Sequence, residues 1–174
     1  MIERRDRTLR GHVRPGRLQD EDEVRAIADQ VFTVFGEYGS WLPGYLSHQG
    51  IWSFVYEERG EVIGFAMLGV FEPEAPGEGR LGDLLAIAVR ASDQGRGVGT
   101  KLLEKVTEKA RQLVSVVSLQ EVRLTVAEPN VRAQRLFARF GFLPVEGDHG
   151  FYDKGQRALR LGLVLMSNVD APEE

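Results

Sequence analysis

The residues best suited to chemistry form a short glycine-rich run, 94–100, with the sequence Gln-Gly-Arg-Gly-Val-Gly-Thr. An apolar stretch typical of a strand, 84–89, precedes it, and a stretch with helical periodicity, 99–114, follows it. A loop of small residues between a strand and a helix exposes backbone N–H groups that bind anions, usually phosphate. The run therefore predicts a phosphate-binding loop.

Two familiar nucleotide-binding patterns do not match this loop. A Walker A loop ends in glycine, lysine and then serine or threonine, whereas here Gly99 is followed by Thr100 and Lys101 in the inverted order. A Rossmann loop has a third glycine three positions after the second, and position 100 is threonine. A nucleotide-binding enzyme is therefore disfavoured, and a plain glycine-rich turn stays open as the structural alternative.

Composition limits the class of protein. A chain of 174 residues with 43% hydrophobic and 28% charged residues fits one globular domain. The net charge of −4 does not favour nucleic acid as a partner. No cysteine is available as a nucleophile or metal ligand, and the three histidines are scattered, so we expect no metal site. The charged start of the chain and the lack of an apolar run of about 20 residues predict a cytoplasmic protein without a membrane segment.

Periodicity predicts a mixed α/β domain with one twisted sheet and helices on both faces. Asp20 and Glu23 are spaced as a capping box at the start of the first helix. We expect a single domain over 1–174, with flexible tails at 1–10 and 168–174. The expected helices are 20–36, 99–114 and 130–140, with a short helix or lid near 41–46, and the expected strands are 12–14, 51–57, 61–71, 81–89, 121–127, 142–146 and 158–166.

The glycine loop resembles the Gln/Arg-x-x-Gly-x-Gly/Ala signature of the GNAT N-acetyltransferase family. The strand before it also agrees, and a second family motif follows at Leu124-Thr125-Val126, Asn130, Ala133, Leu136, Phe137 and Gly141-Phe142. The resemblance is specific over about 80–142 and looser over 51–165. It implies the GNAT fold, with about seven strands and about four helices, and acetyl-CoA as cosubstrate.

The resemblance also implies the cofactor-binding residues. The loop would hold the pyrophosphate, with added charge from Arg96, and the pantetheine arm would pair with the strand before it. Asn130 would contact the arm, although a helix N-cap is the structural alternative, and Phe137 would pack beside the sulfur. The implied set is Ile87, Ala88, Val89, Gln94, Gly95, Arg96, Gly97, Val98, Gly99, Thr100, Asn130 and Phe137.

Asp83 is the candidate general base, because it is the only charge in an otherwise apolar strand. One branch of the family carries a glutamate at this place. Burial would have to raise the pKa of Asp83 for it to act near neutral pH, and a structural hydrogen-bonding role stays open. Another branch uses a glutamate where this chain has Thr125, which cannot act as a base; Glu128 lies nearby but follows the strand.

The general acid is less clearly marked. The tyrosine usual in the family aligns with Phe137, which has no proton to donate. Tyr152 is the first candidate in its place and Tyr45 the second, with simple packing as the alternative for each.

Substrate selection is expected in the segments 38–48 and 148–155, which would cover the acceptor groove. Their aromatic residues could build a wall of that groove, or equally a homodimer surface. These residues are Trp41, Tyr45, Phe151 and Tyr152.

Two functions therefore stay open. The first is direct transfer of an acetyl group from acetyl-CoA to a primary amine on a small molecule or a peptide. The second is a non-catalytic acyl-CoA-binding module that acts as a sensor or scaffold. Phe137 and Thr125 support the second, because they depart from the catalytic pattern of the family.

Overall fold

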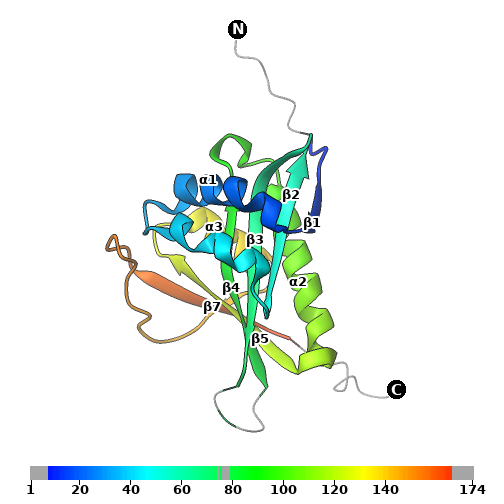
Figure 1. The fold of residues 1–174 in the computed structure, drawn as a ribbon. Coiled ribbons are helices and arrows are strands. Elements are labelled where there is room, and N and C mark those ends of the chain that lie inside the picture. Colours follow the sequence, from blue (N-terminus) through cyan, green and yellow to red (C-terminus); the bar gives the residue numbers. More distant parts are fainter. Residues whose placement is uncertain (1–7, 74, 76–78, 166–174) are drawn as a thin grey trace.

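The computed structural model describes residues 8–73, 75 and 79–165, and its centre is one seven-stranded sheet in the order β1-β2-β3-β4-β5-β7-β6 (Figure 1). Neighbouring strands are antiparallel except for β4 and β5, which run parallel. The strands are β1 His12–Pro15, β2 Ile51–Glu58, β3 Glu61–Phe71, β4 Arg80–Val89, β5 Leu119–Ala127, β6 Leu143–Pro144 and β7 Ala158–Val164.

Helices cover both faces of the sheet (Figure 1). One apolar cluster joins α1 to β2, β3 and β4, and a second, larger cluster joins α2 and α3 to the opposite face. The α-helices of the described residues are α1 Glu21–Phe32, α2 Val98–Val117 and α3 Val131–Arg139, and the 3-10 helices are η1 Leu18–Asp20, η2 Tyr38–Ser40, η3 Leu42–Ser47 and η4 Ala91–Asp93. Within the described ranges, no helix is long and apolar enough to cross a membrane.

The two parallel strands β4 and β5 pair only at their beginnings. Their ladder joins Arg80–Asp83 of β4 to Leu119–Arg123 of β5 and stops there. A bulge against β3 follows at once, because Leu68 pairs with Leu84 and Met67 with Ala86. On its other edge, β5 pairs with β7 from Glu121 to Ala127, so its second half has a partner on that edge alone. The sheet is therefore split between the ends of β4 and β5.

Most of the expected elements are confirmed. The hairpin between β2 and β3 turns at Arg59 and Gly60, which both have positive φ, as a tight hairpin requires. The first helix ends earlier than expected, at Phe32, where a turn begins. The strand expected over 142–146 is reduced to Leu143–Pro144, and the N–H of Val145 makes one further hydrogen bond to the carbonyl of Arg160, at 2.9 Å.

The expected tails lie mostly outside the described residues, which exclude 1–7 and 166–174. Residues 8–10 are described, and two of them are held by hydrogen bonds rather than being a free tail. Arg96 donates to the carbonyl of Thr8, and the N–H of Arg10 donates to Glu58. The single-domain boundary at 1–174 stays a prediction.

The expected capping box at Asp20 and Glu23 is wrong. The Asp20 carboxylate makes no cap bond to α1 and instead accepts hydrogen bonds from both terminal nitrogens of Arg14 and from the N–H of Arg17, each at 2.8 Å. Arg14 thereby holds the pKa of Asp20 below its usual value of 3.8. This contact ties β1 to the beginning of α1.

We expect Asp20→Asn to lower the free energy of unfolding by about 2 kcal/mol, because it removes a charge-assisted pair from a residue that is 5% exposed. The pKa of Asp20 is lowered in the folded state, so the contribution is complete above 3.8 and is lost as the pH falls through the lowered value. Denaturant unfolding of the two proteins across this range measures it. The control Glu104→Gln, in an exposed pair with Lys101, should change stability by less than about 0.5 kcal/mol; an equal effect of both variants would contradict the assignment.

Candidate active site

A groove of ≈ 440 Å³ runs from the open end of β4 into the loop that follows it. All of the predicted cofactor-binding residues except Arg96 line this groove. The residues of the described chain that line it are Val31, Ile87, Ala88, Val89, Asp93, Gln94, Gly95, Gly97, Val98, Gly99, Thr100, Asn130, Arg132, Ala133, Leu136, Phe137 and Arg139. The groove therefore brings the glycine loop together with part of the second motif, from Asn130 to Phe137, although the two lie 30 positions apart in the sequence.

The end of β4 offers main-chain groups to this groove. The N–H of Arg90 donates to the carbonyl of Ile63 across β3. Because N–H and C=O directions alternate along a strand, those of Ile87 and Val89 point to the opposite side, toward the split in the sheet. The Val89 carbonyl accepts a bond from Gln94 Nε2 at 3.0 Å. The main chain at Ile87 is thus left as an edge to which an extended group could pair.

The loop has the geometry of an anion-binding site. Gly95 and Gly97 have φ of +78° and +98°, a region that favours glycine. Helix α2 begins at Val98, so its first N–H groups have no partner within the helix and carry partial positive charge. The loop and the helix start face the same groove, as an anion site requires.

Two basic residues at the groove were missed from the sequence. Arg132 and Arg139 of α3 both line it, and Arg139 lies 3.4 Å from the Thr100 hydroxyl. Their spacing of seven positions, two helical turns, is the signal that could have found them.

The prediction that the charge of Arg96 lines the anion site is not supported. Its guanidinium lies outside the groove, where it pairs with Glu58 and Asp93. Lys101, the next basic residue along the chain, pairs with Glu104 on the exposed side of α2. The cations beside the groove come from α3.

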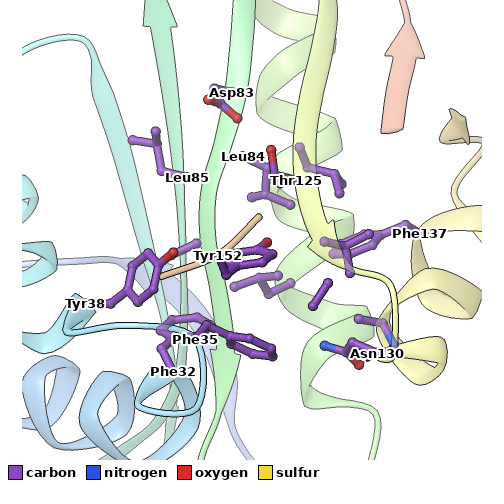
Figure 2. A pocket seen from close by; sticks show the side chains of 16 residues that line it. Phe32, Phe35, Tyr38, Asp83, Leu84, Leu85, Thr125, Asn130, Phe137 and Tyr152 are labelled. Carbon is purple, nitrogen blue, oxygen red and sulfur yellow. Dashed lines mark hydrogen bonds between the residues drawn. The ribbon is translucent and has the colours of Figure 1, made fainter. Parts of the chain in front are cut away.

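A second hollow of ≈ 200 Å³ lies where β4 and β5 separate (Figure 2). Asp83 comes to it from β4, Thr125 from β5 and Tyr152 from the loop before β7. This hollow, which we call the split-sheet cavity, shares lining residues with the groove, so the two adjoin. The shared residues are Ile87, Asn130, Ala133 and Phe137.

Asp83 has the environment expected of a general base. Burial raises the pKa of its carboxyl above the usual 3.8, and the positive charge of Arg160 opposes this rise. No hydrogen bond to its carboxylate is found among the described residues, which gives the structural alternative no support.

Tyr152 is the tyrosine of the split-sheet cavity. Its ring packs on Phe35, with the centroids 5.2 Å apart. Burial, together with nearby Tyr38 and Asp83, raises the pKa of its phenol to about 12. The phenol therefore keeps its proton at neutral pH and is close enough to Asp83 to be coupled to it electrostatically.

The predicted aromatic wall is corrected by the structure. Of its four expected members, only Tyr152 lines the split-sheet cavity. Tyr45 packs between the rings of Trp41 and His48, and Phe151 is 69% exposed. The other aromatic lining residues come from α1 and the segment after it: Phe32, Phe35 and Tyr38.

The motif after β5 is placed as follows. The Asn130 side chain accepts a bond from the N–H of Ala133 at 3.2 Å, which confirms the N-cap, and it also lines both hollows. Phe137 is 4% exposed and lies at their junction. Thr125 lines the split-sheet cavity, whereas Glu128 is exposed and lies 3.9 Å from Arg157.

The sequence profile of the acetyltransferase (GNAT) family matches residues 21–142. The match covers the first helix, the split between β4 and β5, the glycine loop and the Asn130 motif. The chain belongs to the GNAT acetyltransferase family.

Individual relatives are more distant. The chain is 33% identical over 86 residues to the spermine/spermidine N(1)-acetyltransferase of Bacillus subtilis (strain 168), covering 48% of this chain and 54% of the relative. It is 34% identical over 85 residues to the L-2,4-diaminobutyric acid acetyltransferase of Virgibacillus pantothenticus, covering 49% and 48%. The chain therefore spans about half the length of the curated relatives it matches.

The fold has solved counterparts. Arabidopsis thaliana NAA60 in complex with acetyl-CoA superposes with a TM-score of 0.72 over 88% of this chain and 98% of that one, at 21% sequence identity. At this identity the likeness shows a shared fold.

We expect the Asp83 carboxyl to titrate above 3.8 and Arg160→Met to raise its pKa further, because the variant removes the cation that opposes the rise. Carboxyl-carbon chemical shifts followed by NMR against pH measure both values. The control Arg157→Met removes an exposed cation three positions before Arg160 and should leave the pKa of Asp83 unchanged. An Asp83 pKa at or below 3.8 would contradict the assigned environment.

Proposed function

We propose that the protein is an acetyl-CoA-dependent N-acetyltransferase that passes the acetyl group directly to a primary amine. The observation that carries this proposal is that the glycine-loop groove and the split-sheet cavity adjoin at Phe137 and Asn130. A ligand anchored by phosphate at the loop could extend through the split to a half-buried carboxylate. Membership of the family supports the same activity.

The residues present suit coenzyme A. The loop N–H groups and the start of α2 would hold the pyrophosphate, with Arg132 and Arg139 supplying positive charge. The open main chain at Ile87 would pair with the amides of the pantetheine arm. Asn130 and Phe137 would line the passage to the split-sheet cavity.

When bound, acetyl-CoA would supply the acetyl thioester, so that an ammonium ion and the thioester give an amide, a free thiol and one proton. Asp83, as carboxylate, would take a proton from the incoming ammonium, directly or through water. Tyr152 would give its phenolic proton to the leaving sulfur. The second proton that the nitrogen loses would then reprotonate the Tyr152 phenol. No side-chain nucleophile is needed, which agrees with a chain that has no cysteine.

The residues that line the split-sheet cavity suggest which kind of acceptor amine would bind there. Phe32, Phe35, Tyr38 and Tyr152 supply apolar faces and aromatic rings that attract cations, around one carboxylate. An amine on an apolar body, from a small molecule or a peptide, suits this lining better than a heavily hydroxylated amine. Two of the relatives are named as spermine/spermidine and diaminobutyric acid acetyltransferases, which is consistent with an amine acceptor.

A second candidate function, suggested by Phe137, is a module that binds acyl-CoA without turnover. The ring lies where the family carries its tyrosine, and Thr125 cannot act as a base. Tyr152 and Asp83 lie together in the split-sheet cavity, and this favours the catalytic function.

We also infer a cytoplasmic location, because a chain without cysteine suits a reducing compartment. Homodimerisation stays a prediction, and exposed Trp41 and Phe151 are the residues that suggest it.

The decisive experiment incubates the protein with acetyl-CoA and a panel of amines and peptides and follows thiol release. The chain has no cysteine, so a thiol reagent would report only free coenzyme A. Release that depends on an amine supports the transferase. Binding of coenzyme A without release across the panel would favour the acyl-CoA-binding module, and no binding would overturn both.

We expect Asp83→Asn to lower kcat about a hundredfold with little change in affinity for coenzyme A, because it removes the base and keeps its shape. The wild-type rate should rise with pH through the raised pKa of Asp83, since only the carboxylate accepts a proton, and the variant should lose this limb. The control Glu128→Gln, an exposed carboxylate outside the split-sheet cavity, should keep the wild-type profile. A full rate for Asp83→Asn would remove it as the base.

We expect Tyr152→Phe to lower kcat about tenfold or more while the ring keeps its packing on Phe35. The phenol has a pKa of about 12, so the wild-type rate should show no loss from its ionisation near neutral pH. Tyr45→Phe is the matched control, because Tyr45 lies outside the split-sheet cavity. If only Tyr45→Phe reduced the rate in steady-state kinetics, Tyr152 would not be the acid.

A further inference from the structure

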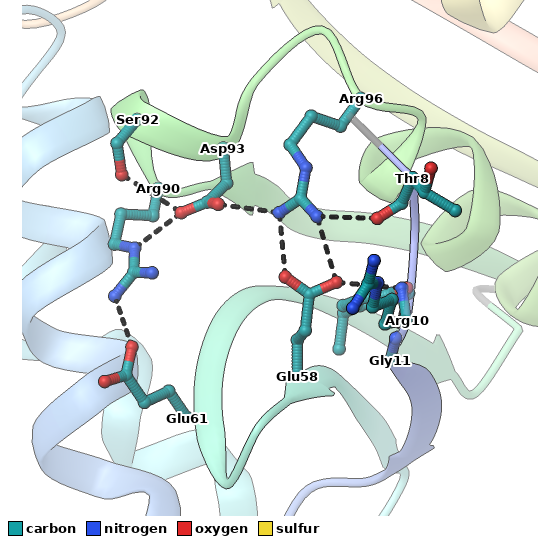
Figure 3. A network of polar contacts seen from close by, with 10 residues as sticks. Thr8, Arg10, Gly11, Glu58, Glu61, Arg90, Ser92, Asp93 and Arg96 are labelled. Carbon is teal, nitrogen blue, oxygen red and sulfur yellow. Dashed lines mark hydrogen bonds and ion pairs between the residues drawn. The ribbon is translucent and has the colours of Figure 1, made fainter. Parts of the chain in front are cut away.

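A charged cluster contacts the glycine loop (Figure 3), and of its side chains Asp93 lines the groove, whereas Arg96 and Glu58 do not. Its centre is Arg96, which stands between the two positive-φ glycines. Nη1 and Nη2 of Arg96 lie 2.9 and 3.0 Å from the two carboxylate oxygens of Glu58, at the end of β2. Both side chains are little exposed, at 12% and 13%. A two-pronged arginine–carboxylate contact of this kind fixes orientation as well as distance.

A second carboxylate joins the loop to the same hairpin. Asp93 accepts from Arg96 at 2.8 Å and from Arg90 Nε at 2.7 Å, and Arg90 in turn donates to Glu61 at 3.0 Å. Glu58 and Glu61 are the residues on either side of the β2–β3 turn. Both sides of that turn are therefore connected by ion pairs to the segment 90–96.

The beginning of the described chain completes the cluster. Nη2 of Arg96 donates to the Thr8 carbonyl at 3.1 Å, and the N–H of Arg10 donates to Glu58 Oε1 at 2.9 Å. Arg96 lowers the pKa of Glu58. Against the effect of burial, the hydrogen bonds that Asp93 accepts lower the pKa of its carboxyl, so both carboxylates stay charged at neutral pH. Three segments far apart in sequence thus meet at one guanidinium.

The loop needs such support because its conformation is costly to hold. The residues on either side of Arg96 are glycines with positive φ. Glycine is flexible in the unfolded chain, so ordering this loop costs much conformational entropy. An anion gains affinity when the N–H groups that bind it are already directed at it. A side chain anchored between the two glycines would hold those groups toward the groove.

We infer that Glu58 is a positioning residue for the phosphate-binding loop, and that it acts through Arg96 on the affinity for the pyrophosphate of coenzyme A. This inference rests on the proposed function for the identity of the ligand. Glu58 itself does not line the groove. A cluster that only stabilised the fold would affect ligands with and without a pyrophosphate alike.

The test compares Glu58→Gln with the wild type in binding coenzyme A and pantetheine, which lacks the pyrophosphate and the nucleotide. We expect the Kd for coenzyme A, measured by calorimetry, to rise about tenfold, which corresponds to one charge-assisted bond. The Kd for pantetheine should stay within about twofold. Where turnover is measurable, KM for acetyl-CoA should rise with kcat nearly unchanged.

Glu57→Gln is the matched control, because Glu57 is the neighbouring residue and also pairs with an arginine, Arg14, at 2.6 Å but away from the loop. It should leave both affinities unchanged. Arg96→Lys keeps the charge and loses the two-pronged contact, so it should reproduce part of the Glu58→Gln effect. Thermal unfolding of each variant confirms that it is folded.

The inference is overturned if Glu58→Gln weakens both ligands equally, if Glu57→Gln weakens coenzyme A as much, or if the wild type does not bind coenzyme A. Failure of the proposed function alone is a different result: the wild type would bind coenzyme A but transfer no acetyl group. The Kd comparison still tests Glu58 in that case, because it requires no turnover.

Discussion

The separation of β4 from β5 is the constraint on which the site depends. The strands pair only as far as Asp83 and Arg123, and the bulge beside Leu84 turns β4 away. Every group that we place at the site borders the resulting split or the loop beyond it. A continuous sheet would have used the main chain at Ile87 in a ladder and left no passage beside Phe137.

The two ends of this passage differ in their electrostatics. At the glycine loop, a helix start and two arginines of α3 favour an anion. At Asp83, burial and aromatic rings surround a carboxylate whose pKa is raised, which suits an incoming amine. A ligand with phosphate at one end and a reactive acyl group at the other matches this arrangement. The ion pairs at Arg96 stabilise the loop at the anion end, and the guanidinium itself lies outside the groove.

Local sequence patterns were sufficient for much of the fold and for the loop. Alternation and turn residues located β2, β3 and β4, and the glycines of 94–100 marked the strand-to-helix turn. Patterns failed where an ion-pair partner outside the motif decided the outcome. Asp20 looks like a helix cap but bonds to Arg14, and Arg96 looks like a phosphate ligand but pairs with Glu58. In both cases a carboxylate and a guanidinium form charge-assisted hydrogen bonds with each other.

By itself, the sequence determined the type of ligand loop, the position of Asn130 at a helix start and the replacement of the family's tyrosine by Phe137. These features depend on residue type and short spacing. Only the tertiary structure decided which aromatic residues line the split-sheet cavity, that Tyr152 rather than Tyr45 approaches Asp83, and which way Arg96 turns. Burial, and the electrostatic contacts that shift the pKa values, arise between segments that meet only in the folded chain.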